Sequence, residues 1–210
     1  MKRARQLEFP SHGGRREGAG RPRGLRVSHA PRPRFGKPLP AHVTLRVAGH
    51  VWNLRSGRCF KALRRAFAAS RGRFGLRLIE FAVLGNHLHL IVEADGTSSL
   101  SRGMQGLNIR IARALNRVMR RRGRVFADHY HERLLTTPSE LVHAIGYVLG
   151  NAAHHYGTRQ HSSARQKGEA GDPFSSAHAR DLLAAPEGWL LRTGWHRAKR
   201  VPHWMRALRG

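Results

Sequence analysis

Polar and apolar residues alternate along the segment HVTLRV at residues 42–47, as they do in a β-strand that is buried on one face. Two further runs typical of strands follow, RLIEFAVL at residues 77–84 and HLHLIVE at residues 87–93. Only Gly85 and Asn86 separate these two runs, and this pair suits the positive φ angles of a tight hairpin turn. The pattern therefore predicts one strand and, after an intervening segment, a two-stranded hairpin.

Apolar residues recur at helical spacing in other parts of the chain. Residues 57–70 predict a first helix, with apolar positions at Phe60, Leu63 and Phe67. A second helix is predicted to begin at Ser98 or Ser99 and to end at Gly123, and its apolar stripe consists of Leu100, Met104, Leu107, Ile111 and Val118. Residues 125–135 predict a fourth strand, and residues 138 to about 154 predict a third helix.

The predicted order is β-α-β-β-α-β with an additional C-terminal helix that carries Tyr147, which indicates an α+β, ferredoxin-like fold with one antiparallel sheet. This domain covers residues 41–156. Residues 1–40 are rich in Pro, Gly and Arg without apolar periodicity, which predicts a disordered basic arm. Residues 157–210 are interpreted as a polar loop and a basic, Trp-containing C-terminal tail that packs back on the domain or contacts nucleic acid.

The net charge of the chain indicates a polyanionic partner. There are 39 Lys and Arg residues against 12 Asp and Glu residues, a formal net charge of +27. A compact protein with this charge repels itself unless a polyanion such as nucleic acid neutralises it. Arginine-rich coding bias is the alternative explanation, but it does not explain why acidic residues are so few. No apolar run approaches the roughly 20 residues that span a bilayer, so we expect no membrane partner.

Cys59 is the only cysteine, which excludes an internal disulfide or a Cys-rich zinc site and fits a reducing compartment. The N-terminus has basic residues but lacks the apolar segment of a secretory signal. We therefore expect a soluble, cytoplasmic and nucleoid-associated protein.

Two groups of arginines are candidate contacts to DNA phosphates. The tetrapeptide Gly20-Arg21-Pro22-Arg23 resembles the core of an AT-hook, although an arm this rich in Arg and Pro matches such a motif easily. The second helix and its end carry the other group, Arg113, Arg117, Arg120, Arg121 and Arg122. The alternative interpretation of this group is the solvated face that every surface helix has.

Two histidines, a tyrosine and an asparagine are the candidates for chemistry. Successive residues of a strand point to opposite faces, so His87 and His89 share one face with Ile91 and Glu93. They are either metal ligands or polar residues on a solvated face, and a metal would need a third donor. Tyr147 and Asn151 stand four apart on the third helix, on one face. A phenol near a divalent cation can deprotonate and attack a phosphodiester.

Other residues compete for the same roles. Glu93 is the alternative third ligand, because it shares the histidine face. Tyr130, within His129-Tyr130-His131, is expected to pack inward, and Tyr156 is expected to cap or pack at the end of the third helix. His143 lies one turn before Tyr147 and either orients the DNA or the phenol or faces solvent.

The ordered motifs resemble the single-tyrosine HUH transposases, and most closely the REP-associated tyrosine transposases with an IS200-like domain. The segments that carry the resemblance lie between about residues 42 and 155 and are HVTLR, GNHLHLIVE, RRRGR, FADHYHERLL and YVLGNAAHH. The resemblance implies Mg²⁺ or Mn²⁺ held by His87, His89 and the Asn151 side-chain oxygen. It further implies that Tyr147 forms a 5′-phosphotyrosine link to single-stranded DNA beside a hairpin.

The function implied is that of a metal-dependent DNA transposase or nickase, which cleaves and rejoins single strands as a monomer or a homodimer. In a dimer, Tyr147 could serve the histidines of the second copy. The alternative is a non-catalytic, basic DNA- or RNA-binding protein derived from a transposase. A replication or conjugation relaxase is disfavoured, because those enzymes usually place their tyrosines and ligands in a different order.

Overall fold

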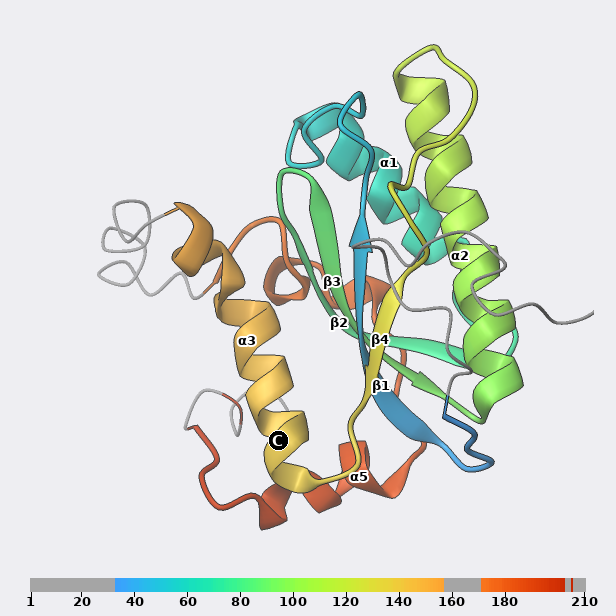
Figure 1. Ribbon diagram of the computed structural model, residues 1–210. Helices are drawn as coiled ribbons and strands as arrows, with labels where there is room; N and C mark the ends of the chain where they lie inside the picture. The colour runs from blue at the N-terminus through green and yellow to red at the C-terminus, as the bar shows by residue number, and fades with distance from the viewer. Residues whose placement is uncertain (1–32, 157–170, 203–204, 206–210) are drawn as a thin grey trace, which may run out of the picture.

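A four-stranded antiparallel sheet lies between two layers of helices (Figure 1). The computed structural model describes residues 33–156, 171–202 and 205. The first part of the chain forms the elements β1 (Leu39–Arg46), α1 (Gly57–Ala68), β2 (Leu76–Val83), β3 (His87–Ala94), α2 (Thr97–Val118), β4 (His131–Leu134) and α3 (Pro138–Tyr156). The predicted β-α-β-β-α-β order followed by a further helix is therefore confirmed.

The strands are arranged in the order β2-β3-β1-β4, and every neighbouring pair is antiparallel. The helix that carries Tyr147, α3, is not the last element of the chain. After it come the 3₁₀ helices η2 (Ser176–His178) and η3 (Arg180–Leu182), the short helix α5 (Trp189–Arg192) and the 3₁₀ helix η4 (Gly194–Arg197). None of the helices in these described ranges is long and apolar enough to cross a membrane.

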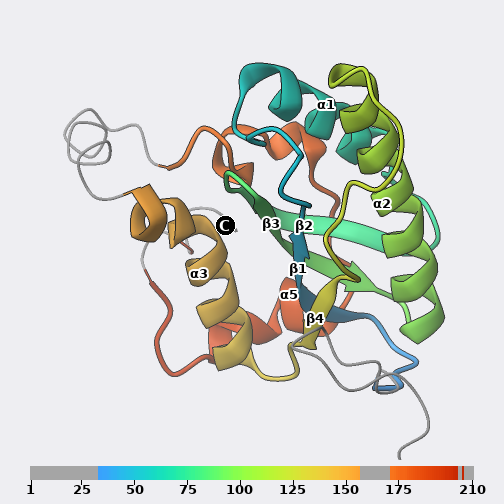
Figure 2. The same cartoon turned by 45° about the horizontal axis from the view of Figure 1, so that its top comes forward.

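The two faces of the sheet bury two separate apolar cores. Helices α1 and α2 lie on one face of the sheet and α3 lies on the other (Figure 2). Leu88, Leu90 and Val92 of β3 belong to the core beneath α1 and α2, whereas Ile91 belongs to the core beneath α3. The alternation predicted for β3 is thus confirmed. Because α3 covers the face that carries the odd-numbered residues of β3, the histidines lie on the side of the sheet where Tyr147 can approach them.

The second helix ends earlier than predicted, at Val118 rather than near Gly123. Arg120 adopts a left-handed φ of 51°, and its N–H donates to the carbonyl of Arg117, while the N–H of Arg121 donates to that of Asn116 at 2.9 Å. These two bonds are the Schellman arrangement, in which glycine is the usual left-handed residue. Here Arg120 occupies that position. The prediction took Gly123 as the residue that ends α2 and therefore placed the end of the helix too late.

The fourth strand is also shorter than predicted, because only His131–Leu134 pair with β1. Residues 125–127 are bonded to the end of β1 through a single bridge between Phe126 and Val47. The Asp128 carboxylate then accepts from the N–H of His129 at 2.8 Å. A short polar side chain that captures a neighbouring N–H competes with strand pairing, and here it marks the interruption.

The hairpin between β2 and β3 does not use the predicted positive φ angles, since neither Gly85 nor Asn86 lies in that region. The N–H of Leu84 donates to the carbonyl of His87 at 2.9 Å. The carbonyls of Gly85 and Asn86 accept from Leu54 and Val47 at 2.9 and 3.0 Å. The connection is held by the neighbouring β1–α1 loop, and a two-residue sequence signal contains no information about that loop.

The start of α3 follows directly from the sequence Thr137-Pro138-Ser139-Glu140. The Thr137 hydroxyl accepts from the N–H of Glu140 at 3.2 Å, and the Glu140 carboxylate accepts from the N–H of Thr137 at 3.2 Å. This reciprocal pair is a capping box, and Pro138 fits the first helical turn, where no N–H is needed. The cap fixes where α3 begins and hence where Tyr147 lies along it.

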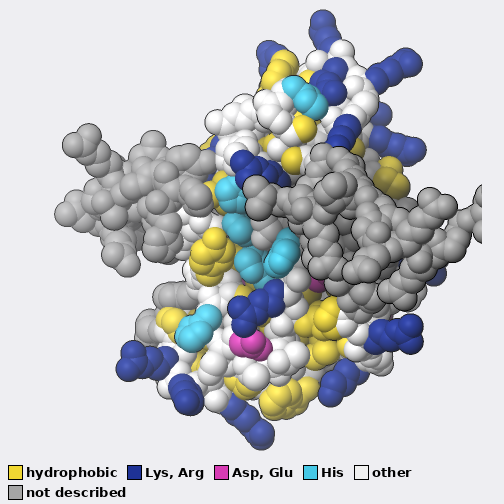
Figure 3. All heavy atoms as spheres, in the orientation of Figure 1, with side chains coloured by type: hydrophobic (Ala, Val, Ile, Leu, Met, Phe, Trp, Pro, Cys, Tyr) yellow, Lys and Arg dark blue, Asp and Glu magenta, His cyan; other side chains and the backbone are white. Residues whose placement is uncertain are grey.

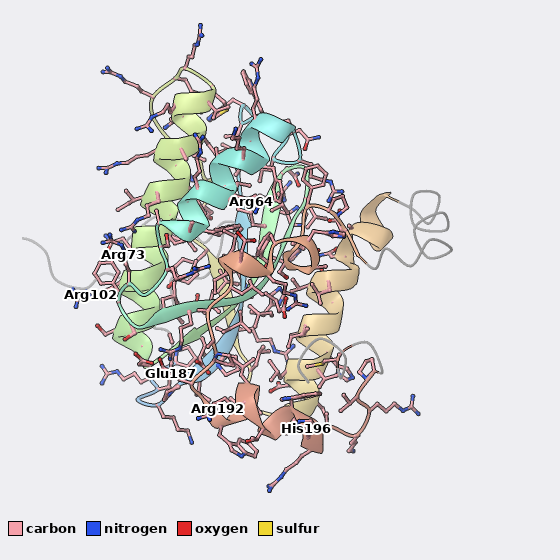
Figure 4. All side chains as sticks on the ribbon, turned by 180° about the vertical axis from the view of Figure 1, so that it is seen from behind. Arg64, Arg73, Arg102, Glu187, Arg192 and His196 are labelled. Atoms are coloured by element: carbon pink, nitrogen blue, oxygen red, sulfur yellow. The ribbon has the colours of Figure 1, made fainter. Side chains whose placement is uncertain are left out.

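Residues 171–202 pack against the open edge of β2 and the α3 face, as the view from behind shows (Figure 4). The N–H of Val83 donates to the carbonyl of Phe174, and that of Ala184 donates to Leu78, both at 2.9 Å. Arg55 makes a bidentate ion pair with the buried Asp172, with both distances 2.7 Å. This segment covers the β2 edge, which would otherwise expose unpaired backbone groups.

The capping box gives a pH-dependent prediction. Hydrogen bonds from Thr136 and the Arg133 side chain lower the pKa of Glu140 from 4.5 to about 2. We expect Glu140→Ala to lower the free energy of unfolding by about 1 kcal/mol at neutral pH, the usual contribution of a helix cap. Because the folded-state pKa is depressed, this difference is full above 4.5 and is lost as the pH falls towards 2.

Thermal melts of wild type and Glu140→Ala between pH 7 and 3 measure this difference. Asp181→Ala is the matched control, since Asp181 is 67% exposed and its contact with Arg64 is 3.4 Å long. It should change the melting temperature little at any pH. A Glu140→Ala effect of constant size across the range would show that the charge of Glu140 does not support the cap.

Candidate active site beneath helix α3

The two histidines of β3 stand side by side on the face beneath α3. Their ring centroids are 4.9 Å apart, and the rings are nearly perpendicular, at 85°. His89 is only 5% exposed, whereas His87 is partly buried at the end of the strand. The prediction that they are neighbours is therefore confirmed, and the interpretation of both as solvated residues is wrong for His89.

The neighbouring strand β1 adds two residues to the site, His42 and Thr44, that the sequence pattern alone did not identify. The register places Thr44 opposite His89 and Arg46 opposite His87, so alternate residues of β1 share the histidine face. His42 Nε2 lies 3.0 Å from His89 Nδ1, and Thr44 Oγ1 lies 3.2 Å from the same nitrogen. The alternation in HVTLR indicates that His42 and Thr44 share one face of β1. Only the β1–β3 register shows that this face adjoins His89.

Both histidines have their Nδ1 atoms engaged by polar neighbours. His87 Nδ1 donates to Asn86 Oδ1 at 2.7 Å, while His89 Nδ1 is held by His42 and Thr44. A metal-binding histidine commonly donates one ring N–H to the protein and coordinates through the other nitrogen. The arrangement therefore assigns Nε2 of each ring as the atom suited to coordination.

The environment of His42 favours its neutral form. Burial lowers the pKa of His42, and electrostatic repulsion from His131 and Arg133 on β4 lowers it further. A neutral imidazole has one ring nitrogen that accepts a hydrogen bond. His42 Nε2 can therefore accept the Nδ1–H of His89, which leaves the lone pair of His89 on Nε2.

Helix α3 brings Tyr147 over this pair of strands. The phenol ring contacts His89 with its centroid 5.3 Å away at 83°, and it contacts His42 at 5.8 Å and 67°. Tyr147 remains 47% exposed, because it lies beside the buried stripe of α3 rather than within it. The structure thus places the Tyr147 ring against His89 and His42, at the hollow that His87 also lines.

An open hollow of about 710 Å³ adjoins the tyrosine and the histidines. It is lined by Thr44, Arg46, Asn53, Leu84, Gly85, Asn86, His87, His89 and Tyr147. In the space-filling view the histidine side chains gather at the centre of this face, with Lys and Arg side chains around them (Figure 3). A phosphate group entering the hollow meets imidazole, phenol and guanidinium groups together.

Asn151 lies one turn after Tyr147 on α3, but it is 1% exposed. Its Nδ2 is buried without a hydrogen-bond partner among the described residues. No group of three or more His, Cys, Asp or Glu side chains within that same part of the chain could hold a metal. A third ligand would therefore come from another residue type. A flip of the Asn151 side-chain amide, which exchanges its oxygen and nitrogen, would put an oxygen where the unpartnered N–H₂ group lies.

The alternative that Glu93 supplies the third ligand is wrong, because its carboxylate already has other partners. Its carboxylate is fully buried and accepts from Arg77 Nε at 2.7 Å and from the N–H groups of Glu187 and Gly188, both at 2.8 Å. Arg77 also pairs with Asp95 and, at 3.2 Å, with Glu187. Glu93 thus anchors the C-terminal segment, and its oxygens are already engaged.

The structure places two of the three residues that competed for a role at the site, Tyr130 and His143. Tyr130 is 7% exposed and lies in the core beneath α1 and α2, as predicted, on the opposite face of the sheet from the histidines. Tyr156 is the last residue of α3, and its side chain lies outside the described residues. His143 is exposed, in agreement with the interpretation that it faces solvent.

The candidate DNA-binding arginines differ in their surroundings. Arg113, Arg117, Arg120 and Arg122 are exposed at or beyond the C-terminal half of α2. The guanidinium of Arg121 instead donates to the carbonyls of Arg122 and Arg124 at 3.0 and 3.2 Å, so it also stabilises the loop. Arg21 and Arg23 of the AT-hook-like segment lie outside the described residues.

No protein-family model matches the sequence, and no curated protein matches it either. Solved structures do match. A REP-associated tyrosine transposase bound to a REP hairpin aligns with a TM-score of 0.58 and 17% sequence identity, over 77% of this chain and 92% of that one. The chain shares the fold of a REP-associated tyrosine transposase.

A protein from Deinococcus radiodurans, assigned provisionally as a transposase, aligns with 11% identity over 77% of this chain and all of that one. Its TM-score is 0.39. The alignment with the REP-associated transposase, at 17% identity, concerns the fold alone. It confirms the family resemblance noted in the sequence as a resemblance of fold.

The site geometry predicts the tautomer of His87. We expect the neutral ring to carry its proton on Nδ1, because Asn86 Oδ1 accepts there at 2.7 Å. Nitrogen-15 NMR of the histidine rings distinguishes the two tautomers. Asn86→Ala should shift the population towards Nε2–H, whereas Asn53→Ala, which lines the same hollow, should leave it unchanged. A wild-type ring protonated mainly on Nε2 would contradict the assignment of Nε2 as the coordinating atom.

Proposed function

We propose that this chain is a metal-dependent, single-tyrosine DNA strand transferase of the transposase or nickase type, with Tyr147 as its nucleophile. The observation that carries the proposal is the packing of the Tyr147 ring against His89, at 5.3 Å between centroids, with His87 beside it and an open hollow in front. Tyr130 is buried in a core, whereas Tyr147 is 47% exposed and its ring contacts those of His89 and His42.

His87 and His89 would hold Mg²⁺ or Mn²⁺ through Nε2, with the Asn151 side-chain oxygen as third ligand. The donor set fits such an ion, because both Nδ1 atoms are engaged by polar neighbours and a flip of the Asn151 amide would put an oxygen in place of its buried N–H₂ group, which has no partner among the described residues. When bound, such an ion would stabilise a negatively charged phenolate beside it and offset the negative charge that grows on a phosphate. Imidazole ligands favour Mn²⁺ on chemical grounds, and cellular abundance favours Mg²⁺.

Tyr147 Oη loses its proton to water in the hollow and forms a bond to the phosphorus of a DNA phosphodiester. The bond from this phosphorus to the 3′ oxygen of the preceding nucleotide breaks, and that oxygen leaves with a proton as a 3′-hydroxyl. The 5′ phosphate stays on Tyr147 as a phosphotyrosine diester. A 3′-hydroxyl can later displace the tyrosine and rejoin a strand, since one phosphoester bond is exchanged for another in each step.

Single-stranded DNA beside a hairpin is the substrate we propose. The net charge of +27 calls for a polyanion, and the exposed arginines of α2 lie on the domain that carries the hollow. The structurally similar transposase was solved with a REP hairpin bound. Base-paired hairpins and unpaired flanks expose different groups, so a protein that binds both can place one phosphate at Tyr147.

Incubation with labelled hairpins from the DNA that flanks its own gene tests the proposal. We expect a covalent protein–DNA band on a denaturing gel with Mn²⁺ or Mg²⁺, and none with EDTA. Tyr147→Phe should remove the band, because phenylalanine lacks the attacking oxygen, while Tyr156→Phe on the same helix should keep it. Peptide mapping of the adduct then assigns the modified residue.

A band that persists in Tyr147→Phe, or that forms equally well in EDTA, would contradict the proposed mechanism. Tight hairpin binding without any adduct would favour the alternative, a basic nucleic-acid-binding protein that has the transposase fold but no catalytic activity.

A further inference from the structure

Three connections meet at the end of the sheet that carries the hollow, and we call this region the loop end. They are the β1–α1 loop (residues 47–56), the β2–β3 turn (residues 84–86) and the loop after α2 (residues 119–127). The first is bonded to the second through Leu54 N–H and the Gly85 carbonyl, at 2.9 Å. It is bonded to the third through Ala48 N–H and the Val125 carbonyl, at 2.8 Å. Figures 1 and 2 both show the three connections side by side.

The β1–α1 loop therefore lies between the chemical centre and the arginines that follow α2. Asn53 of this loop lines the hollow together with His87 and Tyr147. On the other side, His50 Nε2 donates to the carbonyl of Arg124 at 2.9 Å. A DNA strand that leaves the hollow towards the end of α2 has to cross this loop.

Trp52 stands at the middle of that path and is 46% exposed. Its backbone N–H donates to the sulfur of Met119 at 3.5 Å, which ties it to the end of α2 while its ring remains accessible. Trp189 is a useful contrast: it is 53% exposed, but the Arg197 guanidinium lies 5.4 Å from its ring centroid. A large exposed ring within a short hydrogen-bonded loop is a preformed surface for stacking.

The charge around Trp52 has a single sign. Residues 46–58 and 117–127 contain eight arginines and no Asp or Glu. Arg55 is engaged by Asp172 and Arg121 by loop carbonyls, but Arg46, Arg58, Arg120 and Arg122 are exposed. Grooves for single strands combine such cations, which contact phosphates, with aromatic rings, on which bases stack.

We propose that Trp52 is a stacking platform for an unpaired base of the DNA strand that adjoins the phosphate at Tyr147. The exposed arginines at or beside the loop end, Arg46, Arg58, Arg120 and Arg122, contact the phosphates of the same strand. This inference rests on the proposed function for the identity of the strand and goes beyond it by assigning where the unpaired flank lies. Stacking accepts any base, so Trp52 contributes affinity for the flank and little sequence preference.

The test measures binding without chemistry, in EDTA and in a Tyr147→Phe background. Fluorescence anisotropy compares a hairpin that has a single-stranded flank with the same hairpin cut flush. Trp52→Ala should weaken binding of the flanked hairpin by about 5- to 150-fold, the loss of one stacked base, and leave the flush hairpin unchanged. Trp52→Phe should retain most of the affinity, because it keeps an aromatic face.

Trp189→Ala is the matched control, since this residue is as exposed but lies on α5, outside the loop end. It should bind both hairpins as the parent does, and circular dichroism checks that each variant is folded. If Trp52→Ala does not fold, tryptophan fluorescence replaces the binding comparison. The flanked hairpin should quench the fluorescence of the parent and should not quench that of Trp52→Phe.

Equal affinities of Trp52→Ala and parent for the flanked hairpin would overturn the inference, as would an equal loss for both hairpins or a parent that does not distinguish them. The proposed function is tested separately by the covalent adduct. A wild-type protein that forms the adduct while Trp52→Ala binds the flank normally would retain the function and lose only the stacking platform.

Discussion

The antiparallel register between β1 and β3 is the constraint on which the rest of the site depends. It sets Thr44 opposite His89, and it therefore places His42 and Thr44 within hydrogen-bonding distance of His89 Nδ1. A slip of one residue would turn every side chain of β1 to the other face and bury polar groups beneath α1 and α2. The apolar residues that face those helices thus fix the register, and the register fixes the imidazoles.

The second requirement is a helix that brings a phenol to the same face. The buried stripe of α3 includes Leu141, Ile145 and Val148, which pack on the sheet and on residues of α5 and η4. The capping box fixes the first turn, and the stripe fixes the rotation of the helix, so Tyr147 lies at the edge of the contact. The buried pair of Glu93 and Arg77 attaches the C-terminal segment at the other end of the sheet. Removal of one partner of such a pair costs about 3–5 kcal/mol, since the other charge remains buried.

Much of this architecture could be predicted from the chain, because periodicity records which face of each element is buried. The alternation HLHLIVE correctly separated His87 and His89 from Leu88, Leu90 and Val92. Some errors occurred where distant contacts decide local structure. Gly85-Asn86 is held by the β1–α1 loop. The end of α2 was misplaced for a local reason, because the left-handed residue there is Arg120 and not a glycine. His42 was missed because its role depends on a pairing register. Glu93 stayed open as an alternative ligand because its partners Glu187 and Gly188 lie almost a hundred residues away.

The proposed function depends on a divalent ion held by the imidazoles of His87 and His89 beside the phenol of Tyr147. Paramagnetic broadening of ring NMR signals by substoichiometric Mn²⁺ measures this directly, because the effect falls steeply with distance from the ion. Tyr130 serves as the internal reference, since it is buried on the other face of the sheet. Selective broadening of Tyr147, His87 and His89, abolished in a variant with His87→Ala and His89→Ala, is the predicted result. Equal broadening of Tyr147 and Tyr130, or broadening that persists without the two histidines, would contradict a metal centre at this site.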